Sequence, residues 1–245
     1  MGKKVFFVTN NATKLQADCG EKMTRMGYGN LKLDHIYTSA SIVSKYVKRT
    51  YPNVTKVFVI GMKSIRDSLE AEGIEVIGAD SHILDPNVEI NETEFDNMSL
   101  DPDVGAVVFG LDTSFTAQKL LLASLYIREK GVPLIATNDD RGTMTKGRLY
   151  PGAGSSLSSV LTGCNLRKGS KVDSTSVDEP GTFDLIGKPN PFTISLIKEE
   201  HGLEDGQRSV MIGDRPNTDI VFGKAAGVDQ CLVLSGCVLS MEDFE

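Results

Sequence analysis

The stretch SVMIGDRPNTDIVFGKAAG, residues 209–227, predicts a strand, a carboxylate and a helix in immediate succession. Its apolar start is typical of a short buried strand, which ends at Gly213 and Asp214. Pro216 and Asn217 then open a helix, and a glycine follows its last turn. An acidic side chain between a buried strand and a helix lies where open α/β sheets bind ligands, so Asp214 is a candidate metal ligand. The alternative is an ordinary turn in which this aspartate binds nearby backbone N–H groups.

A second strand end carries hydroxyl and amide groups. The apolar residues at the start of the chain run into Thr9, Asn10 and Asn11, and a helix is predicted over residues 14–26, capped by Asn11 or Thr13. Free N–H groups and the helix dipole favour negative charge at such a position, which predicts an anion site. The alternative is a simple asparagine cap.

A third strand end carries a cation. The strand predicted over residues 183–186 leads to Lys188, and a helix over residues 192–201 follows with Asn190 as its cap and Pro191 at its first position. A single lysine in a loop is usually a solvated charge. Here it completes a set, because hydroxyl and amide groups, a cation and a carboxylate for Mg²⁺ together meet most requirements of phosphoryl transfer.

The rest of the chain alternates strands and helices. Strands are predicted over residues 35–38, 56–60, 74–77, 104–109 and 133–137, and helices over residues 41–51, 64–72, 115–130 and 155–161. Residues 80–103 form a polar acidic stretch, residues 138–155 are rich in loop signals, and residues 163–180 are interpreted as a solvated excursion or boundary. This alternation predicts an α/β fold with parallel strands.

Composition narrows the possible functions. The 245 residues are 40% hydrophobic and 24% charged with a formal net charge of −7, which indicates a soluble globular protein and argues against a nucleic-acid partner. We find no apolar run of membrane-spanning length and no signal peptide, so we expect a cytoplasmic protein without membrane partners. The four cysteines and three histidines have no zinc-site spacing, so neither zinc binding nor histidine catalysis is predicted.

Three segments together resemble the second, third and fourth motifs of haloacid dehalogenase (HAD) superfamily phosphatases: residues 9–11 (TNN), 187–189 (GKP) and 213–220 (GDRPNTDI). More narrowly, they are similar to the branch of p-nitrophenylphosphatases and phosphoglycolate phosphatases, which also includes pyridoxal phosphate phosphatase. Further similarities lie at residues 107–112, 136–139, 151–155 and 232–236.

The resemblance implies a Rossmann-like HAD core with an inserted α/β cap domain between the second and third motifs. The core would comprise residues 1–44 and 182–245, and the cap residues 45–181. It also implies Mg²⁺ as cofactor, a covalent aspartyl-phosphate mechanism, a small phosphorylated metabolite as substrate, and a homodimer formed through the cap.

The same resemblance implies roles for individual residues. Thr9 would bind the transferring phosphoryl group, with Asn10 and Asn11 in the same loop, and Lys188 would neutralise nucleophile and phosphate. The catalytic set is therefore expected to be Thr9, Lys188 and Asp219.

The metal site is expected at the fourth motif. Asp214 would ligate Mg²⁺, and Asp219 would support the metal shell by hydrogen bonding. Cap residues 138–141 and 149–154 would help to select the leaving group.

The family's first motif, Asp-x-Asp-Gly after a strand, is expected upstream of Lys3, and it would supply the nucleophile, the general acid and the central strand of the core. A further strand and helix are expected after residue 245. Asp101 and Asp103 have the right spacing but precede their strand. Asp112 follows a strand, but Ser114 stands where the second aspartate should be.

The main hypothesis is thus a Mg²⁺-dependent phosphomonoesterase whose nucleophile is absent from the chain as given. Its substrate could be 2-phosphoglycolate, pyridoxal phosphate or the artificial p-nitrophenyl phosphate. The competing hypothesis is a catalytically inactive HAD-like protein that keeps the phosphate and metal pocket. A nucleotide-binding α/β module is disfavoured, because neither a GxGxxG nor a P-loop pattern follows the first strand.

Overall fold

The computed structural model describes residues 3–79, 93, 95, 98–145, 147–168, 181–204 and 208–236. The chain divides into two compact units, residues 1–185 and 186–245, and each is described by itself. Most of the predicted acidic stretch and of the predicted excursion at residues 163–180 lies outside the described residues. Within the described ranges, no helix is both long enough and apolar enough to cross a membrane.

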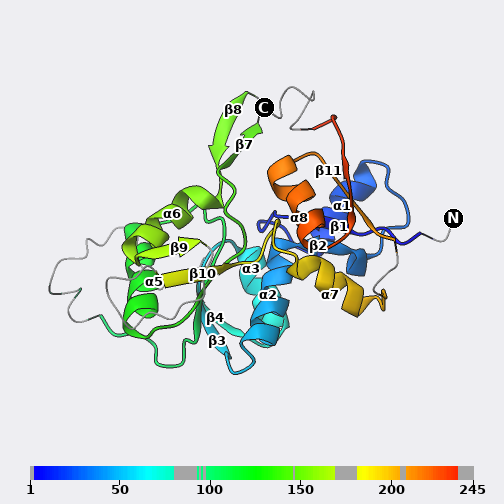
Figure 1. Cartoon of the computed structure of the whole chain (residues 1–245). Coiled ribbons are helices and arrows are strands. Elements are labelled where there is room, and N and C mark those ends of the chain that lie inside the picture. The colour runs from blue at the N-terminus through cyan, green and yellow to red at the C-terminus, as the bar shows by residue number, and fades with distance from the viewer. Residues whose placement is uncertain are drawn as a thin grey trace. The chain divides into compact units, whose positions relative to one another are not determined.

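A six-stranded parallel sheet organises the first unit, in the order β4-β3-β5-β6-β10-β9. The strands are β3 (Lys56–Ile60), β4 (Glu75–Gly78), β5 (Ala106–Phe109), β6 (Leu134–Ala136), β9 (Leu166–Lys168) and β10 (Gly181–Leu185). The helices are α2 (Ser39–Thr50), α3 (Lys63–Ala71), α5 (Ala117–Glu129) and α6 (Ala153–Gly163). Helices α5 and α6 cover one face of the sheet, and α2 and α3 lie on the other (Figure 1).

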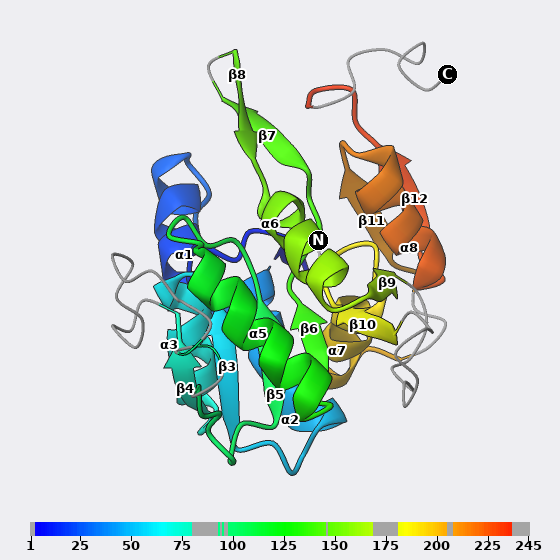
Figure 2. The ribbon, with the colours of Figure 1, turned by 90° about the vertical axis from the view of Figure 1, so that its left-hand side faces the viewer.

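The central strands are apolar because both of their faces are covered. All four residues of β5 are buried, as are all three of β6. Helix α5 packs across the front of the sheet in Figure 2, and its Tyr126 ring lies 5.4 Å from that of Phe58 on β3. The α/β fold class predicted from the sequence is confirmed.

A separate two-stranded parallel sheet holds the amino-terminal loop. It pairs β1 (Phe7–Thr9) with β2 (Ile36–Thr38), so that Thr9 and Thr38 are partners at its carboxyl end. Helix α1 (Gln16–Arg25) and the 3₁₀ turn η1 (Leu33–His35) connect the two strands.

The prediction that Asn11 or Thr13 caps the first helix is wrong. Helix α1 begins later than predicted, after Leu15, whose backbone N–H donates to the carboxylate of Asp18. The side-chain oxygen of Asn11 instead accepts two hydrogen bonds within its own turn. The Asn11 side-chain oxygen therefore bonds within the local turn and does not cap the helix.

An antiparallel hairpin lies where the sequence predicted only loop. Strands β7 (Gly142–Thr145) and β8 (Arg148–Pro151) pair across a turn that contains Gly147 at φ +75°. The sequence did not indicate the hairpin. Because β8 is exposed along its whole length, burial does not alternate along it, and the sequence lacks the apolar–polar alternation that predicts a half-buried strand. The hairpin projects beyond α6 (Figure 2).

The second unit contains α7 (Phe192–Glu200), β11 (Val210–Gly213), the π-helical turn η2 (Pro216–Ile220), α8 (Val221–Ala225) and β12 (Asp229–Leu232). Strands β11 and β12 are parallel, and η2 and α8 connect them. Strand β11 is not buried as predicted, because Val210 and Ile212 keep 54% and 60% of their surface exposed. Its only partner strand among the described residues is β12, which the sequence analysis did not assign.

Candidate functional site

The loop after β1 is folded by its own polar side chains. The hydroxyl oxygen of Thr9 accepts a hydrogen bond from the Asn11 N–H at 3.2 Å. The side-chain oxygen of Asn11 accepts from the backbone N–H and the hydroxyl of Thr13 at 2.7 and 2.8 Å. Successive short-range bonds of this kind give the loop a defined shape. They direct the carboxamide oxygen of Asn11 inward, toward the loop itself.

Two buried serines anchor the same loop, and the sequence analysis missed both. The Ser39 hydroxyl donates to the Thr9 carbonyl at 3.2 Å, and the Ser64 hydroxyl donates to the Ala12 carbonyl at 2.5 Å. Ser39 is the first residue of α2 and Ser64 the second residue of α3. Both are far from the loop in sequence, so no motif indicated them. They fix both ends of the loop that the sequence predicted to bind phosphate.

A buried ion pair joins two of the predicted catalytic residues of the second unit. Lys188 Nζ lies 2.6 Å from Asp219 Oδ1, and the side chains are 13% and 5% exposed. Charges so well shielded from water need a partner, because each would be strongly destabilised alone. The structure thus brings together a cation and an acid that are 31 residues apart.

The second oxygen of Asp219 organises the end of β11. It accepts hydrogen bonds from the backbone N–H groups of Asp214 and Arg215, at 3.2 and 3.1 Å. Asp219 reaches them from the π-helical turn η2, a form often found at functional sites. Gly213 makes this approach possible, since a Cβ there would lie within 2.5 Å of Asp219 Oδ2.

Asp214, the predicted metal ligand, follows β11 directly. Its backbone N–H is held by Asp219, so its position relative to the Lys188–Asp219 pair is defined. Carboxylate oxygens are the ligands that Mg²⁺ prefers. Thr9, Asn10 and Asn11 belong to the first unit, and their joint action with this group stays a prediction.

Asp112, the aspartate that follows β5, interacts with neighbouring groups through both carboxylate oxygens. Its Oδ2 lies 2.6 Å from Lys119 Nζ, and its Oδ1 accepts from the Ser114 N–H at 2.7 Å. Both side chains of the ion pair are buried. Because it is buried and both of its oxygens have partners, the Asp112 carboxylate has a structural role at this end of the sheet.

Asp101 lies at the opposite end of β5, as the sequence analysis expected. It precedes the strand, accepts from the Asp103 N–H at 2.9 Å and pairs with Lys56 at the same distance. The hydrogen bond from Asp103, together with Lys56, lowers the pKa of the Asp101 carboxyl below its ordinary value. These contacts stabilise the amino edge of the sheet.

The two segments predicted to select the leaving group are in direct contact. The Gly152 N–H donates to the Arg141 carbonyl at 2.9 Å, and the Gly154 N–H donates to the Asp140 carbonyl at 3.0 Å. A Cβ on Gly154 would lie 2.8 Å from the Asp139 carbonyl carbon, so only glycine allows this approach. The base of the β7–β8 hairpin is therefore firmly held.

Two large apolar side chains on one strand of that hairpin are exposed. Leu149 and Tyr150 on β8 keep 69% and 67% of their surface accessible. Large apolar side chains held in water on a fixed support are typical of surfaces that contact a ligand or a partner.

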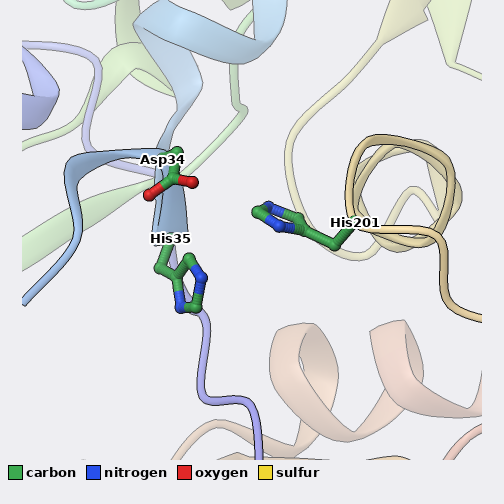
Figure 3. Close-up of side chains that lie close together, drawn as sticks. All are labelled: Asp34, His35 and His201. Carbon is green, nitrogen blue, oxygen red and sulfur yellow. The ribbon is translucent and has the colours of Figure 1, made fainter.

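Figure 3 draws the two histidines that the structure describes, together with Asp34. His35 belongs to η1 in the first unit, where its Nδ1 lies 2.8 Å from the Val5 carbonyl and its ring packs 4.7 Å from that of Phe6. His201 follows α7 in the second unit. These contacts give His35 a structural role within its own unit.

Comparisons with known proteins find the same relationship along almost the whole chain. A HAD-hydrolase-like family model matches residues 185–240, and a haloacid dehalogenase-like hydrolase model matches residues 1–75. The chain is 33% identical to phosphoglycolate phosphatase 2 of Arabidopsis thaliana, over 96% of this chain and 73% of that protein. It is 30% identical to human glycerol-3-phosphate phosphatase, over 96% and 70% of the two chains.

Solved structures agree with the sequence relatives. The 4-nitrophenylphosphatase of Thermotoga maritima superposes with a TM-score of 0.71 at 28% identity, and covers 98% of this chain and 75% of its own. Similarity of sequence and of fold thus extends over both units.

We expect the substitution Asp219→Ala to destabilise the second unit strongly. It would leave the Lys188 ammonium without its partner and two backbone N–H groups without their acceptor. The free energy of unfolding should fall by about 3–5 kcal/mol, as measured by urea unfolding. Asp229→Ala is the matched control, because the Asp229 side chain is 63% exposed. This substitution should lower the free energy of unfolding by less than about 0.5 kcal/mol. Equal losses in both variants would contradict a structural role for the buried pair.

Proposed function

Because this chain belongs to the haloacid dehalogenase-like phosphatases, we propose that it hydrolyses small phosphate monoesters with Mg²⁺ as cofactor. The observation that carries the proposal is the buried Lys188–Asp219 pair beside Asp214 at the end of β11. It provides a fixed cation for phosphate oxygens and a carboxylate for a metal ion. Phosphoryl transfer depends largely on such positioning and charge stabilisation.

The phosphate-binding groups are assigned to two loops. Thr9 and its neighbours Asn10 and Asn11 would donate hydrogen bonds to the transferring phosphoryl group, and Lys188 would neutralise its charge. The anchors Ser39 and Ser64 support this assignment, because they hold the first loop in one shape before substrate arrives.

Mg²⁺ is assigned to Asp214. The donor is a hard carboxylate oxygen of the kind this ion binds, and its backbone is held in place by Asp219. Both oxygens of Asp219 accept hydrogen bonds from the chain, so Asp219 positions the site, while Asp214 is the ligand. When bound, the ion would neutralise charge on the phosphate oxygens.

The proposed reaction passes through an aspartyl-phosphate. An aspartate carboxylate would attack phosphorus while a general acid gives its proton to the departing alcohol. Water, deprotonated by the conjugate base of that acid, would then attack the aspartyl-phosphate, which releases inorganic phosphate and regenerates the carboxylate. We do not assign the nucleophile to Asp112, which is buried, or to Asp101, which lies at the amino end of β5.

The second candidate function is that of a catalytically inactive member of the same family. A protein with the Lys188 and Asp214 chemistry but without a reactive aspartate would bind phosphate and metal without turnover. The two candidates differ in one measurement: hydrolysis of p-nitrophenyl phosphate with and without Mg²⁺.

The substrate class is inferred from the relatives and from the hairpin. Small esters such as 2-phosphoglycolate are proposed, with pyridoxal phosphate as a further candidate. Residues 138–141 and 149–154 would contact the leaving group, since they are bonded to each other and support the exposed Tyr150.

The proposed organisation has a core of residues 1–44 and 182–245 and a cap of residues 45–181, with the second boundary close to β10. We further propose a cytoplasmic homodimer formed through the cap. Parallel strands with polar carboxyl ends, as in β1, support the assignment of the core.

In a chain that carries the first motif, we expect Asp214→Asn to abolish Mg²⁺-dependent hydrolysis of p-nitrophenyl phosphate, because the substitution removes the ligand's charge. The two kinetic predictions that follow apply to the same chain. The assay compares turnover with and without Mg²⁺, and the variant also controls for contaminating phosphatase. Asp229→Asn, on an exposed strand end, should leave turnover unchanged. Retention of most activity in Asp214→Asn would overturn the metal assignment, and phosphate binding without turnover in the unaltered protein would favour the second candidate.

We expect Lys188→Ala to lower kcat about 100-fold or more, with a smaller change in KM, because the cation acts on developing charge. Steady-state kinetics measure both constants. Lys224→Ala, in the exposed part of α8, is the matched control and should behave as the unaltered protein. Near-normal kinetics for Lys188→Ala would count against its role in phosphoryl transfer.

We expect Tyr150→Ala to change substrate preference without loss of stability, because its side chain is exposed on the hairpin. The ratio of kcat/KM for 2-phosphoglycolate and p-nitrophenyl phosphate should shift about tenfold or more. Met26→Ala is the matched control, because Met26 is an equally exposed apolar residue at the end of α1, and it should leave the ratio unchanged. An unaltered ratio for Tyr150→Ala would remove the hairpin from the leaving-group site.

A further inference from the structure

Gly236 lies next to the predicted metal ligand although 22 residues separate them in the sequence. The segment that follows β12 runs along the end of β11, where the Val233 N–H donates to the Gly213 carbonyl at 2.9 Å. This bond carries the chain past Asp214 and brings Gly236 against its side chain.

The contact is so close that only glycine fits. A Cβ on Gly236 would lie 2.6 Å from both Cβ and Cγ of Asp214, and closer still to Oδ2, whereas real Cβ atoms essentially never approach within 3.0 Å. Backbone conformation does not require the glycine, because Gly236 is not among the described glycines with positive φ. Space for the carboxylate is therefore the reason for glycine at this position.

Gly213 shows the same relationship to the other acid of the site. Its missing Cβ would lie 2.5 Å from Asp219 Oδ2, the oxygen that accepts from two backbone N–H groups. Each of the two carboxylates thus packs directly on the Cα of one glycine. Asp219 is also held by Lys188, and Gly236 limits the directions open to the Asp214 side chain.

We infer that Gly236 is a positioning residue that sets the direction of the Asp214 carboxylate for metal binding. The inference rests on the proposed function, because it takes Asp214 as the metal ligand. A methyl group at residue 236 would force the Asp214 side chain to rotate away, and its oxygen would leave the position in which it meets the ion. Such indirect supports commonly contribute 10- to 100-fold to metal affinity.

The test measures binding of Mn²⁺, a paramagnetic substitute for Mg²⁺, by electron paramagnetic resonance and water proton relaxation. We expect Gly236→Ala to bind Mn²⁺ about tenfold or more weakly than the unaltered protein. Gly29→Ala is the matched control, because a Cβ on Gly29 meets no atom within 4 Å and its φ is not positive. This control should bind as the unaltered protein does.

Asp214→Asn separates failure of this inference from failure of the proposed function. If the unaltered protein binds no Mn²⁺, or if Asp214→Asn binds it normally, the metal assignment falls and the inference with it. If Asp214→Asn loses binding while Gly236→Ala retains it, only the role of Gly236 is overturned. Weaker binding in Gly236→Ala, with no further loss when the two substitutions are combined, supports it.

A stability measurement covers the case in which Gly236→Ala folds poorly. The destabilisation should be smaller in an Asp214→Gly background, because Cβ, Cγ and Oδ2, which crowd residue 236, are then all absent. Equal destabilisation in both backgrounds would show that Asp214 is not what the methyl group meets, and would overturn the inference.

Discussion

The carboxylate of Asp219 joins the parts of the second unit that matter for chemistry. One oxygen pairs with Lys188 at 2.6 Å, and the other accepts from the N–H groups of Asp214 and Arg215. Shielded from water, the charge of the lysine and that of the aspartate would each be strongly destabilised without the other. The same acid therefore keeps a cation in place and fixes both peptide units that flank Asp214.

Close packing by glycine extends this constraint to the second carboxylate. Gly213 admits Asp219, and Gly236 lies against Asp214, so neither acid has room to turn in that direction. Carboxylates near one another tend to separate or to bind protons. Here Lys188 neutralises one of them, and the proposed metal ion would neutralise the other. Such an arrangement suits a site that must hold phosphate, which is itself negatively charged.

The first unit uses polar groups in two different ways. At the carboxyl end of β5, Asp112 and Lys119 form a buried pair that stabilises the sheet edge. At the carboxyl end of β1, Thr9 and Asn11 shape a loop, and two serine hydroxyls donate hydrogen bonds to its backbone carbonyls. The exposed hairpin of β7 and β8 supplies a third kind of surface, apolar and accessible, on a base held by main-chain hydrogen bonds.

The amino-acid sequence by itself determined the α/β class and the residues that follow β1 and β11, because periodicity, strand ends and turn residues are local properties. It also indicated the family, through three short motifs. Only the tertiary structure decided that Asp219 pairs with Lys188, that Ser39 and Ser64 hold the first loop, and that Gly236 limits Asp214. These contacts join residues far apart in the chain. Their partners are selected by packing and by the cost of leaving a buried polar group unpaired, which no local pattern records.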